Sequence, residues 1–156
     1  MPKKILLLRH AEEPDEEDNL DLSAAGRQRA EQLSAYIPRT FGKPRFLFAA
    51  APSSSSVRCY LTLRPLSDRL GLHIDAPYED RDFTALAAKI LADPAFDNAL
   101  IVVAWTHKQL PALASAMNVS RDDFPGRWNE EAFDLIFELT YRKRPRPKVR
   151  RIKQPF

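Results

Sequence analysis

Two of the three histidines in this 156-residue chain follow its two most apolar stretches. His10 comes just after the aliphatic run at 5–8, and His107 comes just after "ALIVVAW" at 99–105. Wholly apolar runs of this length are typical of strands buried on both faces of a parallel sheet. Ligands of open α/β sheets bind at the carboxyl ends of such strands. If the two strands are neighbours, both imidazoles lie at one edge of the sheet. His73, in a short amphipathic segment, is expected to be structural.

Two arginines belong to the same predicted site. Arg9 precedes His10, and Arg58 lies in the first turns of a helix that begins after "PSSSS", near Ser55 or Ser56. Guanidinium groups and a helix N-terminus both bind tetrahedral oxyanions such as phosphate. A neutral imidazole can attack phosphorus, and a second, protonated imidazole can stabilise the charge that develops during transfer. We expect no metal, because two guanidiniums beside the histidines would repel a cation.

The elements that position these residues alternate along the chain. Strands are predicted at 45–51 and 72–76 in addition to the two apolar runs, and helices are predicted at 23–37, 55–71, 82–93 and 109–117. Pro65 should kink or restart the second helix. The alternating segment 131–142 predicts a half-exposed strand near the sheet edge, with 148–156 as its hairpin partner. This order predicts an α/β fold: a three-layer sandwich with a mostly parallel central sheet, helices on both faces and one domain over 1–156.

Composition narrows the class of protein. Hydrophobic residues make up 44% and charged residues 29% of the chain, as in globular proteins. No apolar stretch approaches the roughly 20 residues that cross a bilayer, so we expect no membrane partner. The amino-terminal residues lack the features of a signal peptide. Cys59 is the one cysteine, which excludes an internal disulfide and favours a cytoplasmic location.

Charge is unevenly distributed. Seven acids and no base lie at 12–21, and eight bases and no acid lie at 142–153. A basic tail can bind nucleic acid, but prolines interrupt this one and no aromatic residues are interleaved for stacking on bases. We therefore favour a solvated edge strand, in which Lys and Arg discourage aggregation, over nucleic-acid binding.

Four motifs, in order, resemble those of one known family. "LLLRHAE" is similar to the Arg-His-Gly signature of the histidine phosphatase superfamily, which includes phosphoglycerate mutases, acid phosphatases and phosphohistidine phosphatases. "DLSAAGRQRAEQL" resembles its Leu-Thr-x-x-Gly-x-x-Gln-Ala segment, "SSSSVRCYLT" its Ser-Ser-Pro-x-x-Arg-Ala-x-Gln-Thr segment, and "LIVVAWTH" its strand ending in Ser-His-Gly. The resemblance covers residues 4 to 117 and implies a phosphoglycerate mutase-like fold. Ala11 and Lys108 replace signature glycines, and Ser55 and Leu61 replace the usual Pro and Gln.

The resemblance implies a role for each residue of the site. His10 would be the phosphorylated nucleophile, and Arg9, Arg58 and His107 would complete the phosphate pocket, with Ser54 or a neighbouring hydroxyl nearby. Neither a cofactor nor a metal would be required.

The acid that protonates the leaving group stays open at this point. The candidates are Glu79, Asp80 and Asp82 in "YEDRDF", together with Glu12 and the acids of the 15–21 loop. The chain is too short for the large insertions that form lids in mutases and phytases, so an open pocket is expected. Lys108 would add a cation near the pocket or across its rim.

The favoured function is a cofactor-independent hydrolase: a cytoplasmic phosphatase of phosphomonoesters or phosphoproteins that acts through phosphohistidine at His10. Its partner would be a phosphorylated small molecule or a phosphoprotein. The alternative is a catalytically weak or inactive domain that binds phosphate or phosphoproteins. A mutase ranks lower, because it needs a closed pocket to retain its intermediate.

Overall fold

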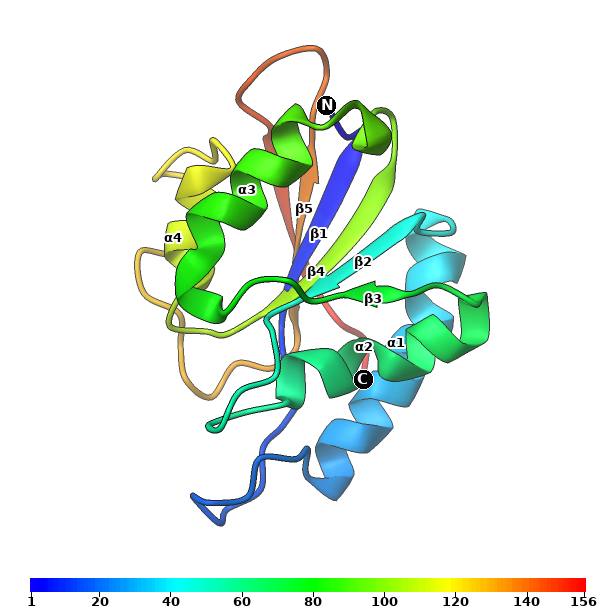
Figure 1. The fold of residues 1–156 in the computed structure, drawn as a ribbon, viewed down its shortest axis with the longest axis vertical. Coiled ribbons are helices and arrows are strands. Elements are labelled where there is room, and N and C mark those ends of the chain that lie inside the picture. The colour runs from blue at the N-terminus through cyan, green and yellow to red at the C-terminus, as the bar shows by residue number, and fades with distance from the viewer.

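The computed structural model describes residues 1–156 and alternates strands with helices along most of the chain (Figure 1). The strands are β1 (Lys4–Arg9), β2 (Phe46–Ala49), β3 (Ile74–Asp75), β4 (Leu100–Trp105), β5 (Leu135–Thr140) and β6 (Lys148–Lys153). The helices are α1 (Ala24–Phe41), α2 (Arg58–Leu70), α3 (Phe83–Ala92) and α4 (Leu110–Ala116), with short 3-10 helices η1 (Asp80–Asp82) and η2 (Pro94–Phe96). The predicted elements are all present, with ends that differ by a few residues.

The six strands form one sheet in the order β3-β2-β4-β1-β5-β6. The pairs β2–β3, β2–β4 and β1–β4 are parallel, whereas β5 runs antiparallel to β1 and to β6. The predicted mostly parallel sheet is confirmed. Because β1 and β4 are neighbours, their carboxyl ends lie side by side, as the two-histidine hypothesis requires.

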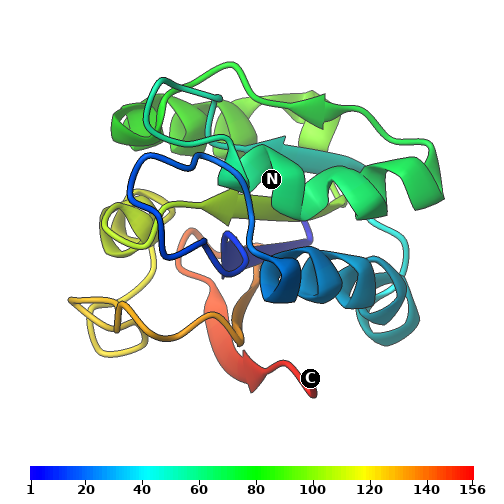
Figure 2. The same cartoon turned by 90° about the horizontal axis from the view of Figure 1, so that it is seen from below.

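Helices cover both faces of this sheet. Helices α1 and α2 lie together on one face, and α3 and α4 lie on the other (Figures 1 and 2). Ile5–Leu8 in β1 and Ile101–Ala104 in β4 have no exposed surface, because each strand is covered from both sides. Wholly apolar strands are expected for this three-layer α/β arrangement.

Helix α2 does not restart at Pro65 but runs without interruption from Arg58 to Leu70. Proline cannot donate a backbone hydrogen bond to the carbonyl one turn earlier. Buried residues on both sides of it, Cys59 and Leu63 before and Leu66 after, hold the helix against the core. Packing of the apolar face therefore keeps the helix continuous where local propensity predicts a break.

Strand β5 is not half-exposed, as its alternating pattern predicts, but buried on both faces. Phe137 packs against an aromatic cluster with Phe124, the two ring centroids lying 4.3 Å apart. On the other face the Glu138 carboxylate is 5% exposed and pairs with Lys4 at 2.8 Å and Arg150 at 3.0 Å. The polar face of β5 can be buried because Lys4 in β1 and Arg150 in β6 neutralise the Glu138 carboxylate. The edge position belongs to β6, which pairs with β5 as the predicted hairpin.

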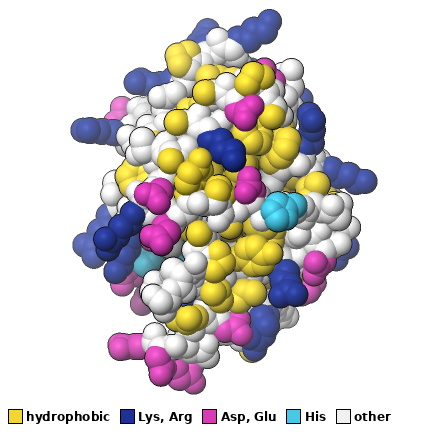
Figure 3. Space-filling model, viewed as in Figure 1, with side chains coloured by type: hydrophobic (Ala, Val, Ile, Leu, Met, Phe, Trp, Pro, Cys, Tyr) yellow, Lys and Arg dark blue, Asp and Glu magenta, His cyan; other side chains and the backbone are white.

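Acidic side chains gather at one end of the molecule. This is the lower end in Figure 3, where the loop after β1 lies in Figure 1, whereas Lys and Arg side chains are spread over the face that Figure 3 shows. Part of the basic stretch forms ion pairs within the hairpin, since Lys153 lies 3.7 Å from the Asp134 carboxylate. No helix is long and apolar enough to cross a membrane.

Candidate functional site

The carboxyl ends of β1 and β4 bring the two predicted histidines to one edge of the sheet. Arg9 pairs in register with Trp105, and the backbone N–H of His10 donates to the Trp105 carbonyl at 3.3 Å. His107 lies two residues beyond the end of the adjacent strand β4. Burial lowers the pKa of both His10 and His107, and the positive charge of Arg9 acts in the same direction on each. The sheet therefore brings both histidine-bearing segments to one edge.

His10 is held as a neutral imidazole in one tautomer. Its side chain is buried, and Nδ1–H donates to the carbonyl of Ala11 at 2.7 Å, which leaves the lone pair on Nε2. Burial lowers the pKa of His10 to about 4. The positive charges of Arg9 and Arg58 act in the same direction, whereas the hydrogen bond to Ala11 raises the pKa. A neutral ring with a free Nε2 is the form that a nucleophile needs.

Hydrogen bonds to α2 fix the backbone next to His10. The N–H of Ala11 donates to the Thr62 hydroxyl at 2.8 Å, and that hydroxyl donates to the Arg58 carbonyl at 2.7 Å. A threonine one turn into α2 therefore joins the segment that follows His10 to the first residue of the helix, which carries the second arginine. These hydrogen bonds tie the start of α2, and with it Arg58, to the chain next to His10.

Arg9 is held beneath a loop from the far end of the chain. Its Nη1 donates to the carbonyls of Glu130 and Ala132, and its guanidinium carbon lies 3.9 Å from the ring centroid of Phe133. Burial lowers the pKa of Arg9 to about 10, so the group stays charged at neutral pH. The buried Arg9 Nε has no hydrogen-bond partner.

Arg58 is held by the acidic loop that follows β1. Its Nε donates to the carbonyl of Asp21 at 3.0 Å, and its Nη2 donates to the carbonyl of Asn19. Its third nitrogen, Nη1, lies 3.3 Å from the Glu13 carboxylate. Helix α2 thus begins with a cation whose three guanidinium nitrogens all contact the acidic loop.

His107 presents an unsatisfied nitrogen. Its Nε2 is buried and has no hydrogen-bond partner. Burial lowers the pKa of His107, and the positive charges of Arg9 and Lys108 act in the same direction. These effects disfavour the protonated second imidazole of the sequence hypothesis. A bound dianion would raise the pKa of His107, because negative charge favours the imidazolium form.

Glu13 is a member of the site that the sequence analysis did not single out. Its carboxylate lies 3.7 Å from Arg9 Nη2 and 3.3 Å from Arg58 Nη1, between the two arginines. The spacing of Arg9 and Glu13 could not reveal this contact, because the intervening chain is not helical and seven acids follow His10 within twelve residues.

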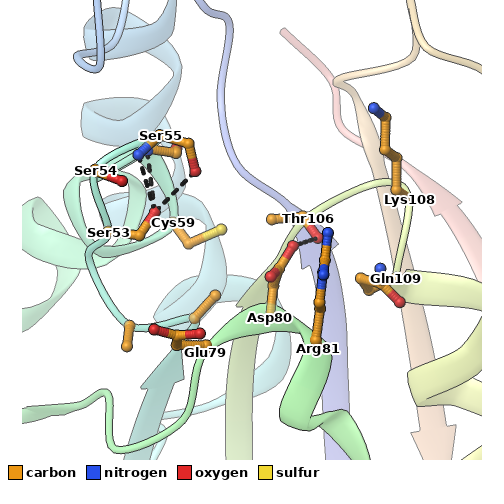
Figure 4. Close-up of a pocket in the computed structure, with 13 residues that line it drawn as sticks. Ser53, Ser54, Ser55, Cys59, Glu79, Asp80, Arg81, Thr106, Lys108 and Gln109 are labelled. Carbon is orange, nitrogen blue, oxygen red and sulfur yellow. Dashed lines mark hydrogen bonds between the residues drawn. The ribbon is translucent and has the colours of Figure 1, made fainter.

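An open cavity of 440 Å³ lies beside this site (Figure 4). It is lined by Ala50, Ala51, Ser53, Ser54, Ser55, Ser56, Cys59, Glu79, Asp80, Arg81, Thr106, Lys108 and Gln109. The lining includes neighbours in sequence of Arg58 and His107 but none of the four predicted site residues themselves. The open pocket expected from the chain length does not extend to His10, which is 4% exposed with the Phe133 ring centroid 6.1 Å from its own.

Of the acids considered for protonating the leaving group, two lie at this cavity. Glu79 and Asp80 line the cavity, and Asp80 accepts a hydrogen bond from the Thr106 hydroxyl at 2.9 Å (Figure 4). Asp82 is exposed and does not line it. Glu12 accepts from Arg29 Nε on α1 at 2.5 Å and is committed to that ion pair. No group of three or more His, Cys, Asp or Glu side chains is arranged to hold a metal ion.

Comparison with solved structures identifies the fold. No protein-family model matches the chain, and no curated protein matches it in sequence. A protein histidine phosphatase SixA complexed with tungstate superposes with a TM-score of 0.66 at 13% identity over 96% of both chains. A mycobacterial glucosyl-3-phosphoglycerate phosphatase gives a TM-score of 0.63 at 13% identity, covering 97% of this chain and 98% of that one. A phosphoglycerate mutase from Plasmodium falciparum gives 0.56 at 11% identity, covering 97% and 89%.

These neighbours share one architecture. The chain has a phosphoglycerate mutase-like fold, as the resemblance of its four sequence motifs implies.

Proposed function

We propose that this chain is a metal-independent phosphatase that hydrolyses phosphomonoesters or phosphoproteins through a phosphohistidine on His10. The observation that carries the proposal is a pair of unsatisfied buried nitrogens, Arg9 Nε and His107 Nε2, beside a neutral His10. Buried polar groups are almost always hydrogen-bonded in native proteins. Two orphaned groups at one site, both able to donate, are suited to the oxygens of a bound phosphate.

The geometry supports a two-step reaction. In the first step His10 Nε2 attacks phosphorus, a P–N bond forms, and the P–O bond to the leaving group breaks. The hydrogen bond from Nδ1 to the Ala11 carbonyl stabilises the positive charge that the ring then carries. In the second step water attacks phosphorus, the P–N bond breaks, and Nε2 regains its lone pair. The proton of the water passes to the carboxylate that protonated the leaving group, and inorganic phosphate leaves.

Each remaining group has a place in this scheme. Arg9, Arg58 and His107 bind the phosphoryl oxygens as charge builds up on them, which is the usual contribution of preorganised donors. The leaving group lies toward the cavity, and Glu79 or Asp80 gives it a proton, because these are the two candidate carboxyls that line the cavity. The reaction uses no metal and no cofactor.

The names of two neighbours and the cavity support this substrate class. One neighbour is named a protein histidine phosphatase and another a glucosyl-3-phosphoglycerate phosphatase. A cavity of 440 Å³ lined mostly by polar side chains suits a phosphoprotein side chain or a small hydrophilic phosphomonoester. The cytoplasmic location favoured by the single cysteine remains a prediction.

One observation favours the alternative, a domain that binds phosphorylated partners with little or no turnover. His10 is 4% exposed, and the Glu13 carboxylate already lies between the two arginines. If Glu13 does not move aside, substrate reaches the pocket rim but not the nucleophile.

The deciding experiment compares hydrolysis of a chromogenic phosphomonoester, with chelator present, by wild type, His10→Ala and His73→Ala. His73 is an exposed histidine in the segment before β3 and serves as the matched control. The proposal predicts turnover by wild type and His73→Ala and none by His10→Ala, with all three equally folded. Equal turnover by wild type and His10→Ala would overturn it. No turnover by any protein, with phosphate still raising the unfolding temperature of wild type, would favour the binding domain.

A further inference from the structure

We propose that Glu13 is a resident competitor of substrate: its carboxylate occupies the phosphate position and must be displaced before a phosphorylated ligand binds. The inference rests on the proposed function, since it takes the phosphate pocket as given. Glu13 lies 3.7 Å from Arg9 Nη2 and 3.3 Å from Arg58 Nη1, so one carboxylate bridges two guanidiniums from different elements. A carboxylate in that place provides the charge that a phosphate would provide.

Most of the other nitrogens of both arginines are already engaged. Backbone carbonyls at 130 and 132 accept from Arg9, and backbone carbonyls at 19 and 21 accept from Arg58. These contacts fix the two guanidiniums on either side of Glu13. The nitrogens left for an anion are Arg58 Nη1 and Arg9 Nη2, which both face Glu13, and the unpartnered Arg9 Nε.

Burial shows what Glu13 covers. The Arg9 and Arg58 side chains are 1% and 11% exposed, whereas the Glu13 side chain is 42% exposed. The open cavity is lined by neither arginine nor by His10. The carboxylate therefore lies on the solvent side of a closed pocket, and a change of its side-chain rotamer would open that pocket toward the nucleophile.

The contacts of Glu13 are weak enough to be exchanged. Both ion pairs exceed 3.2 Å and neither meets hydrogen-bond geometry, whereas charge-assisted bonds from guanidinium to phosphate settle at about 2.7–2.9 Å. Half-exposed ion pairs contribute little to stability. A phosphate dianion that makes short bonds to both arginines can therefore displace the carboxylate. Because every anion must displace the Glu13 carboxylate before it binds, Glu13 lowers the affinity of each ligand of this pocket by the same factor.

The test measures the binding of inorganic phosphate by calorimetry to wild type, Glu13→Gln and Glu17→Gln. Glu17 is an exposed acid of the same loop that makes no ion pair, so its variant changes net charge by the same amount without touching the arginines. We expect Glu13→Gln to bind phosphate about three- to tenfold more tightly than wild type, as loss of two weak ion pairs implies. Glu17→Gln should match wild type. Sulfate should gain affinity by the same factor as phosphate.

The outcomes separate this inference from the proposed function. Equal affinities for all three proteins would overturn the role of Glu13 and leave the phosphate site intact. Equal gains in Glu13→Gln and Glu17→Gln would reduce the effect to net charge and also overturn it. Weaker binding by Glu13→Gln would show that Glu13 supports the site. Absence of phosphate binding by every protein would instead contradict the phosphate site itself.

A kinetic measurement distinguishes competition from proton donation. A competitor affects KM, so Glu13→Gln should show a lower KM for phosphomonoesters. A proton donor affects kcat, and most strongly for alkyl phosphates, whose leaving groups need the proton. The test compares the loss of kcat that Glu13→Gln causes, relative to wild type, for the two kinds of substrate. A loss at least tenfold larger with alkyl phosphates than with nitrophenyl phosphate would make Glu13 the acid and overturn its assignment as a competitor.

Discussion

The low pKa of His10 makes protein stability depend on pH in a way that one substitution should remove. Burial lowers the pKa of this imidazole from 6.5 to about 4 in the folded protein, whereas the unfolded chain retains the ordinary value. Between these two pH values the unfolded state binds a proton that the folded state does not bind. The free energy of unfolding therefore falls as pH drops from 6.5 to 4, and this effect is complete below about pH 4.

The magnitude follows from the size of the shift. One pKa unit corresponds to about 1.4 kcal/mol, so the drop of two and a half units costs the folded state about 3 kcal/mol at low pH. His10→Asn keeps a side-chain donor for the Ala11 carbonyl but does not titrate. The difference in unfolding free energy between wild type and His10→Asn should therefore shift by about 3 kcal/mol, to the disadvantage of wild type, between pH 7 and pH 4.

Urea unfolding at several pH values measures this difference, and nitrogen NMR of the imidazole reports its pKa and tautomer directly. We expect a His10 signal with the proton on Nδ1 and a midpoint near pH 4. A midpoint near 6.5, or a stability difference that does not depend on pH, would refute the argument that burial and Arg9 hold His10 neutral.

Three further substitutions test how the scaffold is built. Gly26→Ala would place a Cβ 2.2 Å from the backbone oxygen of Glu12, so it should lower the unfolding temperature strongly and reduce turnover, which thermal unfolding and activity assays will show. Tyr141→Phe removes the hydrogen bond from the buried hydroxyl to the Met117 carbonyl at 2.7 Å and should cost about 1 kcal/mol in urea unfolding. Ser23→Ala removes the side-chain acceptor of the Gly26 N–H at the start of α1 and should also cost about 1 kcal/mol.

The meeting of the two strand ends could be predicted from the sequence. The apolar runs before His10 and His107 required burial on both faces, and parallel neighbours place their carboxyl ends together. The helix starts also coincide with local features, since Ser23 caps α1 and a proline lies in the first turn of α4.

The contacts that cover Arg9 and His10 could not be predicted from the sequence. Arg9 is bound by carbonyls more than 120 residues away, and no periodicity in the sequence connects those segments. Glu13 was one acid among seven, and only its position relative to Arg9 and Arg58 distinguishes it from the others. The expectation of an open pocket, based on the short chain, is wrong at His10. This imidazole is 4% exposed because side chains such as Phe133 lie against it.

The burial of β5 illustrates a similar limit. Its alternation of apolar and polar residues is typical of a strand with one wet face. Glu138 breaks that rule because Lys4 and Arg150 flank it from the neighbouring strands. Pairing across strands depends on register, which the pattern of one strand does not contain. Tertiary contacts decide burial here, as they do for the continuity of α2.

The most direct test of the central claim is to trap the covalent intermediate. Wild type is mixed with a phosphomonoester, quenched in denaturant at alkaline pH, where phosphohistidine survives, and mapped by peptide mass spectrometry. The account predicts one added phosphoryl group on the peptide that contains His10, and none in His10→Asn. Turnover without phosphorylation of His10, or a phosphoryl group on another residue, would contradict it.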